Sequence, residues 1–374
     1  MKLQRITAHG RWYPEIDGLR FVAIFAVLLV HVLGVTLDGT SRALAADARY
    51  SFFVLHAERL GRGVQLFFVI SGFILAQPFL SELEDGGKPL SLKAFYLRRL
   101  TRLEPPYILA LLLYFFGYIV THAAPLRVLV LSLLSSVFYI HNLFPIKPIN
   151  PVTWSLEVEV QFYLLAPFLA RVFRVRSPAL RRSVLLGGGA VLALLPWRWL
   201  DHHGLMFPVH ACYFLVGYLL ADLRIHKRPA WMHPVWDLVS LVCFPLFFFV
   251  DGGGAERLLL SALLLLCFSA SMLGPLTRRL LQVRWIALFG GMCYSIYLLH
   301  MLVLSLLTRP AHRLLMATGL YRNYALYSLL LIPAVLLVST GYFLLIERPC
   351  MDPKWPVKLL HRLRPGGAPP ASMG

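Results

Sequence analysis

The sequence predicts an all-α integral membrane protein, a polytopic helical bundle of about ten transmembrane helices plus one re-entrant or broken segment. Of its 374 residues, 58% are hydrophobic and only 14% are charged, a balance that a water-soluble domain of this size cannot solvate. The hydrophobic residues are gathered in stretches of about 17–25 residues, the length of a helix that crosses a bilayer. Short polar or basic joints separate these stretches.

The formal net charge of +18 would indicate a nucleic-acid partner in a soluble protein. Here the Lys and Arg residues lie mainly in the joints, as in "FYLRRLTRLEPP", "RVFRVRSPALRR" and "LRIHKRPAW". Topogenic anchoring and contact with anionic membrane lipid account for most of this excess, so no nucleic acid is expected. The five cysteines are dispersed without a Cys-x-x-Cys pair, which predicts neither a metal site nor a disulfide framework.

Eleven apolar segments are expected to form helices, from the first near 19–37 to the last near 324–346. In chain order they are 19–37, 63–80, 103–121, 125–141, 154–172, 183–199, 205–222, 233–250, 257–276, 285–306 and 324–346. We expect a single membrane domain over residues 1–350. A short, basic, disordered tail is expected over 351–374, which ends in "RPGGAPPASMG".

The basic residues that precede the first segment indicate a cytoplasmic amino terminus. Eleven full crossings would then place the basic loop 171–182 and the basic tail outside the cell. One segment that enters and returns puts the loops 171–182, 223–230 and 277–284 and the tail all in the cytoplasm. We assign it to 145–165, because "PIKPINPVTWSLEVEVQFY" brings prolines and two acids to membrane depth.

The first apolar segment carries two ionisable residues, Arg20 and His31, that are costly in lipid. They are eleven residues apart, so they share a helical face and lie roughly 16 Å apart along the axis. Asp17 lies one turn before Arg20 on the same face. Arg20, a cation at the cytoplasmic end of the helix, and His31, a proton acceptor deeper in the membrane, would then line one cavity. Alternatively, Arg20 is an anchor that snorkels and His31 is bonded to a neighbouring helix.

Arg99 and Arg102 are three residues apart in "YLRRLTRLEPPY" and share a helical face at the cytoplasmic edge. Guanidinium forks bind phosphate in a bidentate manner, whereas ordinary positive-inside anchoring would also place arginines here. Two arginine sites on one side of the membrane, beside a deep histidine, favour a phosphorylated anionic ligand.

The segment "PVTWSLEVEVQFYLLAP" places Ser155 and Tyr163 at helical spacing four from Glu159, while Glu157 points about 200° away from Glu159. A carboxylate at membrane depth is expensive unless it is protonated, paired or functional. A structural ion pair with one of the arginines is the alternative to a functional Glu159.

The segment "GGMCYSIYLLHMLV" places Cys293, Tyr297 and His300 on one helical face. A functional histidine and a hydrogen-bonded core histidine are both compatible with this pattern. Glu347 in "LIERPC" is expected at the membrane interface, where the last span ends.

Six motifs occur in an order that resembles the acyltransferase-3 family of membrane O-acyltransferases, over nearly the whole chain. They are "YPEIDGLRFVAIFAVLLVHV", "GVQLFFVISGFIL", "RRLTRLEPPY", "WSLEVEVQFYLLAP", "CYSIYLLH" and "IERP". The resemblance implies transfer of an acyl group, most often acetyl from acetyl-CoA, to a hydroxyl of a carbohydrate, glycolipid or related acceptor. It also implies that the protein lies in the bacterial inner (plasma) membrane. Acyl-CoA is the implied co-substrate, and no metal cofactor is expected.

The resemblance assigns roles to individual residues. His31 and Arg20 match the essential pair of the family's first helix, and Arg99 and Arg102 match the paired-arginine motif that meets the phosphates of CoA. The "WSL…E…FY" motif falls on Trp154, Ser155, Glu159 and Tyr163. Departures occur at Gln65, Cys293 and Val160, where many relatives have aspartate, serine and a second glutamate.

An acceptor hydroxyl is a poor nucleophile at neutral pH, so a base must remove its proton as it attacks the thioester. We expect His31 to be that base, with Glu159 or Asp17 orienting its imidazole. An acyl-histidine or acyl-serine relay through Ser71 or Ser155 is an alternative. A secondary transporter would also show broken helices and charges at membrane depth, and a lipid scaffold would leave the arginine pairs unexplained.

Overall fold

The computed structural model describes residues 13–39, 48–84, 90–144, 146–197, 206–251, 253–314, 319–352 and 355, and these residues contain helices but no strand. Each of the eleven apolar segments predicted from the sequence overlaps a helix. Six helices within the described ranges are long and apolar enough to cross a membrane, and two shorter apolar helices accompany them. The protein is therefore a polytopic helical membrane protein, as predicted.

The helices are named here in chain order. Those of the first half are α1 (Pro14–Asp38), α3 (Ala48–Glu58), α4 (Gly63–Glu84), α5 (Leu92–Val120), α6 (Leu126–Val137), α7 (Trp154–Leu169) and α8 (Pro178–Leu194). Those of the second half are α9 (Phe207–Asp222), α10 (Val235–Phe249), α11 (Glu256–Leu273), α12 (Pro275–Leu281), α13 (Arg284–Gly291), α14 (Cys293–Leu314), α15 (Leu320–Tyr342) and α16 (Arg348–Cys350). A π-helical turn, Phe343–Glu347, joins α15 to α16.

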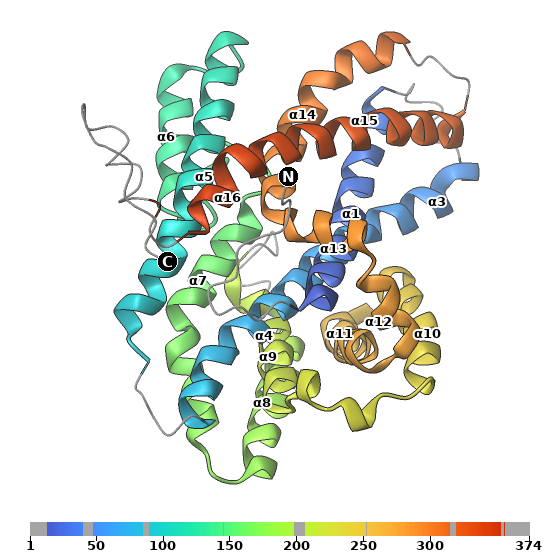
Figure 1. Ribbon diagram of the computed structural model, residues 1–374. Coiled ribbons are helices and arrows are strands. Elements are labelled where there is room, and N and C mark those ends of the chain that lie inside the picture. Colours follow the sequence, from blue (N-terminus) through green and yellow to red (C-terminus); the bar gives the residue numbers. More distant parts are fainter. Residues whose placement is uncertain are drawn as a thin grey trace, which may run out of the picture.

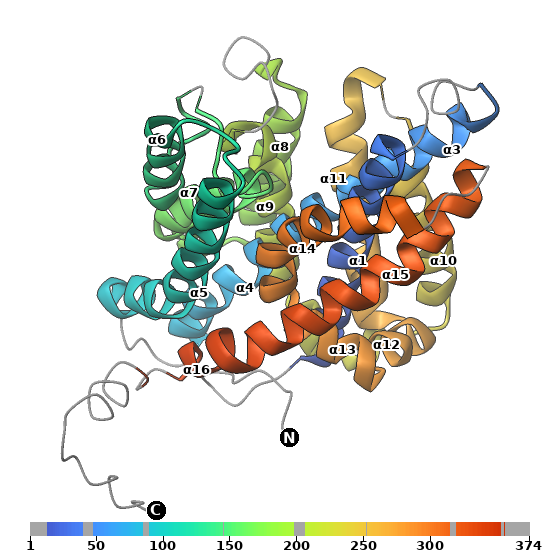
Figure 2. The same cartoon turned by 90° about the horizontal axis from the view of Figure 1, so that it is seen from above.

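Helices α1, α4 and α14 lie between two peripheral groups, with α5 and α6 on one side and α10 to α12 on the other (Figures 1 and 2). Close approach of α4 to α9 depends on Gly72, because a Cβ at this position would lie 2.3 Å from the carbonyl oxygen of Phe214. Glycine thus permits tight packing of two membrane helices, as small residues do in membrane proteins generally. Helix α4 continues through Gly72 without a break.

The broken segment predicted at 145–165 is present but lies earlier in the chain. Tyr139 has a left-handed backbone (φ 55°) that ends the preceding helical turn, and helix resumes at Trp154. Between them the backbone is non-helical wherever it is described. Asn150 is fully buried there and donates from Nδ2 to the carbonyl oxygen of Leu298 at 3.1 Å. Irregular backbone is tolerated at this depth because helices surround it and satisfy its polar groups.

The span predicted at 285–306 is divided into α13 and α14 at Met292. Gly290, near the end of α13, is pressed so closely against α1 that a Cβ would lie 1.6 Å from the carbonyl oxygen of Asp17. This approach fixes α13 against the start of α1, and α14 then leaves in a new direction. The apolar pattern continues across the joint, which is why the sequence does not reveal it.

Helix α5 begins at Leu92, eleven residues before the predicted span, and the side chain of Ser91 caps it by accepting from the N–H of Ala94 at 3.3 Å. Pro105 lacks the N–H that would bond to the carbonyl oxygen of Thr101. Trp355 donates its indole N–H to that oxygen at 2.9 Å. Apart from Met351, Asp352 and Trp355, the tail predicted over 351–374 lies outside the described residues.

Candidate active site

A polar stripe, formed by Ser155, Glu159 and Tyr163, runs along one face of α7 for about 12 Å. Glu159 Oε1 accepts hydrogen bonds from the hydroxyl of Tyr163 and from the hydroxyl of Ser71 on α4, both at 2.5 Å. Ser155 Oγ lies 3.1 Å from the hydroxyl of Tyr297 on α14. The helical spacing read from the sequence thus places these three side chains together, and the stripe connects α7 with both α4 and α14.

Arg20 lies beside the polar stripe, near Glu159. Its Nη1 donates to Asp17 Oδ1 at 2.7 Å, and the side chain of Asp17 is only 1% exposed. Glu159 is also close enough to Arg20 for the two charges to attract each other. Asp17 precedes His31 by fourteen residues on the same helix, about 21 Å along its axis, so it contacts Arg20 and is out of reach of His31.

Arg99 and Arg102 approach the polar stripe from α5, near Tyr163. The guanidinium of Arg99 lies 3.6 Å from the ring centroid of Phe95 and 5.8 Å from that of Tyr163, and its Nη1 donates to the carbonyl oxygen of Phe95 at 2.7 Å. Arg102 Nε is buried without a hydrogen-bond partner among the described residues. Within the described ranges, no carboxylate lies within ion-pair distance of either arginine. Neither guanidinium is therefore neutralised by a carboxylate of the described residues, and the Nε–H of Arg102 has no acceptor there.

His31 and His300 meet where α1 packs against α14. Their ring centroids are 5.0 Å apart with the planes inclined at 42°. His300 is fully buried, and its Nδ1 lies 3.0 Å and 2.8 Å from the carbonyl oxygens of Ile296 and Tyr297. Tyr297 in turn donates from its hydroxyl to the carbonyl oxygen of Val152 in the broken segment at 2.7 Å. The histidine pair is thus connected through α14 to the polar stripe.

Trp154, which the sequence places in the same motif as Glu159, packs in a different direction. Its ring centroid lies 5.5 Å from that of His210 on α9 and 6.5 Å from that of Phe68 on α4. Its carbonyl oxygen accepts from Nδ2 of Asn142 at 3.2 Å. Trp154 therefore belongs to an aromatic wall beside the polar stripe.

Sequence reasoning missed a second buried pair on the opposite face of α7. Glu157 Oε2 lies 2.8 Å from Nδ1 of His141, and both side chains are buried almost completely. The backbone N–H of Asn142 lies 3.2 Å and 3.1 Å from the two oxygens of the same carboxylate. The spacing predicted that Glu157 points away from Glu159, and this is confirmed. The partner His141 was not signalled, because it lies in the irregular segment before α7.

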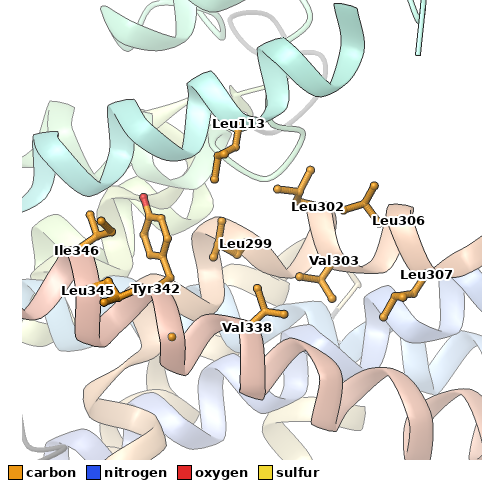
Figure 3. Close-up of a pocket in the computed structure, with 11 residues that line it drawn as sticks. Leu113, Leu299, Leu302, Val303, Leu306, Leu307, Val338, Tyr342, Leu345 and Ile346 are labelled. Atoms are coloured by element: carbon orange, nitrogen blue, oxygen red, sulfur yellow. The ribbon is translucent and has the colours of Figure 1, made fainter. Parts of the chain in front are cut away.

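An apolar groove of about 480 Å³ opens between α5, α14 and α15 (Figure 3). Its lining comes from Leu113, Leu299, Leu302, Val303, Leu306, Leu307, Val338, Gly341, Tyr342, Leu345 and Ile346. Leu299 immediately precedes His300, so the groove and the histidine pair lie on different faces of the same turn of α14. Apart from the phenol of Tyr342, the lining side chains are apolar, and the groove lies outside the polar site.

The arrangement brings together cations, a carboxylate and a histidine pair that the chain supplies from α1, α5, α7 and α14. It can hold an anionic ligand at the arginines and move a proton at the histidines. Among the described residues, no group of three or more His, Cys, Asp or Glu side chains is arranged to bind a metal ion.

Comparison with known proteins gives the family. A family model described as an acyltransferase domain matches residues 13–344. Peptidoglycan O-acetyltransferase OatA of Listeria monocytogenes is 27% identical over 349 residues, which cover 82% of this chain and 52% of that protein. O-acetyltransferase OatA of Staphylococcus aureus is 27% identical over 183 residues, which cover 45% of this chain and 27% of that protein.

The chain thus spans about half the length of the Listeria relative. No solved structure matches it significantly. Because the family model covers most of the sequence, including α1, the polar stripe and the histidine pair, the chain belongs to the acyltransferase-3 family.

Proposed function

We propose that the protein is a membrane O-acyltransferase that moves an acyl group, acetyl in the simplest case, from acyl-CoA to a hydroxyl of a carbohydrate or glycolipid. Membership of the family and the names of the two O-acetyltransferase relatives support this proposal. One relative is named for peptidoglycan, which favours a carbohydrate acceptor. The observation that carries the proposal is that the polar stripe of α7 connects the histidine pair, through Tyr297, with three arginines that lie near Glu159 and Tyr163.

In this proposal, Arg20, Arg99 and Arg102 bind the phosphates of CoA. Arg102 brings a buried Nε–H that lacks a partner among the described residues, and a buried donor of this kind gains most from a charged acceptor. Burial of Arg20 beside Asp17 fixes the direction of its guanidinium. These features fit an anionic ligand better than simple anchoring in lipid headgroups.

His31 is the proposed general base. It takes the proton from the acceptor hydroxyl as the oxygen attacks the thioester carbonyl carbon. The carbon–sulfur bond then breaks, and the CoA thiolate leaves and receives the proton. Glu159 accepts hydrogen bonds from Tyr163 and Ser71 and attracts Arg20. In this scheme it orients the side chains that lie between the arginines and the histidine pair. Positive-inside bias places the amino terminus, and with it the arginines, on the cytoplasmic side, where acyl-CoA is available.

The test uses the purified full chain in lipid nanodiscs with [¹⁴C]acetyl-CoA and soluble muropeptides as acceptors. We expect label on the muropeptides and equal release of CoA thiol. His31→Ala should lower turnover by about 10²- to 10⁴-fold, the usual contribution of a general base. His312→Ala is the matched control, because His312 lies in the same helix pair, with Nε2 3.1 Å from the carbonyl oxygen of Val35, and should retain turnover within a few-fold.

Wild-type turnover in His31→Ala would remove the proposed base. Uptake of a solute without release of CoA thiol would support a secondary transporter, the alternative function.

A further inference from the structure

The hydrogen bonds of His300 determine which of its ring nitrogens carries the proton. Nδ1 faces two backbone carbonyl oxygens, those of Ile296 and Tyr297, at 3.0 Å and 2.8 Å. A carbonyl oxygen only accepts hydrogen bonds, so Nδ1 must be the donor. In the neutral ring Nε2 is therefore unprotonated, and its lone pair is directed away from those carbonyl groups.

This Nε2 is buried and has no hydrogen-bond partner among the described residues. Buried polar atoms in proteins are nearly always paired, because an unpaired one costs the full loss of hydration. The ring of His31 lies against that of His300, with 5.0 Å between centroids. It is a titratable side chain that can present an N–H to this lone pair.

We propose that His300 is the positioning residue of His31. In the structure the two rings lie in contact without a hydrogen bond between them. In the working enzyme His300 Nε2 accepts the N–H of the His31 imidazole and so leaves the other nitrogen of His31 unprotonated toward the acceptor hydroxyl. This inference rests on the proposed role of His31 as base. It assigns to a neutral imidazole the role that a carboxylate has in hydrolytic triads.

Within the described residues, no carboxylate forms an ion pair with His31. Asp17 is held by Arg20, and Glu159 by Tyr163 and Ser71. A neutral imidazole also suits the role of hydrogen-bond acceptor for His31 in the membrane interior, because an ionised carboxylate costs far more free energy to bury there.

The proton balance of the step follows from this arrangement. When His31 takes the hydroxyl proton it becomes an imidazolium with two N–H groups, and one of them remains bonded to His300 Nε2. The positive charge is stabilised by this bond while the ester forms. The proton taken from the hydroxyl is then passed to the CoA thiolate, which leaves as the thiol, and His31 returns to its starting tautomer.

The orientation of His300 depends on the anchoring of α14. The hydroxyl of Tyr297, one turn earlier, donates to the carbonyl oxygen of Val152 at 2.7 Å and thereby fixes the rotation of this helix against the broken segment. The same turn supplies the carbonyl groups that hold His300 Nδ1. The broken segment thus contributes to the placement of the histidine pair.

The experiment is ¹⁵N NMR of the full chain in nanodiscs, labelled at its 13 histidines. The signals of His31 and His300 are assigned by difference from His31→Ala and His300→Gln spectra. For the wild type we expect His300 protonated at Nδ1 and accepting at Nε2, and His31 in a single tautomer. A wild-type His300 protonated at Nε2 would overturn the proposal without any variant needing to fold.

Two variants test the coupling. His300→Phe keeps a ring without an acceptor, so His31 should lose its single tautomer, and turnover should fall about 10- to 100-fold, as with other lost outer-shell hydrogen bonds. The KM for acetyl-CoA should not change. His300→Gln places an amide oxygen near the Nε2 position and should restore the single tautomer and part of the turnover.

The outcomes separate the two proposals. An unchanged His31 tautomer and wild-type turnover in His300→Phe, together with an inactive His31→Ala, would overturn the role of His300 alone. An active His31→Ala would overturn the proposed base itself.

Discussion

Glu347 Oε2 accepts two hydrogen bonds from Ser295, one from its backbone N–H at 3.0 Å and one from its hydroxyl at 2.5 Å. The π-helical turn at Phe343–Glu347 directs this carboxylate inward, where it is only 1% exposed. It therefore ties the end of the last long helical stretch to the start of α14, and Glu347 is buried inside the protein where the last long helical stretch ends. The charges of Arg102 and Arg20 act on it, so it partly neutralises the proposed phosphate site.

Replacement of Glu347 by Gln should tighten CoA binding. The amide oxygen keeps an acceptor for Ser295, while the loss of negative charge leaves the arginines more attractive to phosphate. We expect the Kd for CoA, measured by calorimetry, to fall several-fold. Glu58→Gln, a change of an exposed carboxylate on α3, is the control and should leave the Kd unchanged. An unchanged or higher Kd in Glu347→Gln would show that this carboxylate does not influence the site.

Arg99 and Arg102 should bind CoA as guanidinium forks. Alanine at either position should raise the Kd for CoA about tenfold or more, since a hydrogen bond to a charged group contributes about 1.5–3 kcal/mol. Lysine should recover only part of the affinity, because a point charge replaces a bidentate fork. Arg98→Ala removes an exposed neighbour and serves as the control. Equal Kd values in all these variants would identify the arginines as membrane anchors.

The buried pair of Glu157 and His141 should stabilise the broken segment without contacting CoA. Loss of one partner from a buried pair costs about 3–5 kcal/mol, so Glu157→Gln and His141→Phe should each lower the thermal unfolding midpoint. The double variant Glu157→Gln with His141→Phe should be less destabilised than the sum of the two single changes. The affinity for CoA should not change in any of them. Single variants as stable as the wild type would show that the pair contributes nothing to the fold.

The sequence predicted those parts of the site that depend on helical spacing. Ser155, Glu159 and Tyr163 follow a spacing of four along one helix, and their side chains lie together as that spacing requires. Each apolar segment predicted from its length contains helix, whereas the shorter helix α3 (Ala48–Glu58) was not predicted.

Contacts between distant segments were not predictable in this way. The meeting of His31 with His300 depends on how α1 packs against α14, and the burial of Glu347 depends on a π-helical turn that leaves no mark in the hydrophobic pattern. The division between α13 and α14 was missed for a related reason, since it follows from the close approach of Gly290 to α1.

Three contacts place the basic loops at one end of the molecule. The ring centroid of Tyr13, just before α1, lies 5.4 Å from that of His226 in loop 223–230. Arg278 Nε, in loop 277–284, donates to Glu15 Oε1 on α1 at 2.5 Å. Arg182 Nε, at the end of loop 171–182, donates to Asp222 Oδ2, just before loop 223–230, at 2.9 Å. Loops 171–182, 223–230 and 277–284 thus lie on the side where α1 begins. This arrangement agrees with a segment between α5 and α7 that enters the membrane and returns.

Single cysteines in these loops should therefore share the sidedness of the amino terminus. On a background lacking the five native cysteines, Ala179→Cys, Ala230→Cys and Arg279→Cys should resist a membrane-impermeant thiol reagent in intact cells and react after permeabilisation. Ala123→Cys, in the turn between α5 and α6, should react in intact cells and is the control. Labelling of Ala179→Cys alone would mean that α7 crosses the membrane completely, and Glu159 would then no longer face a cytoplasmic CoA site.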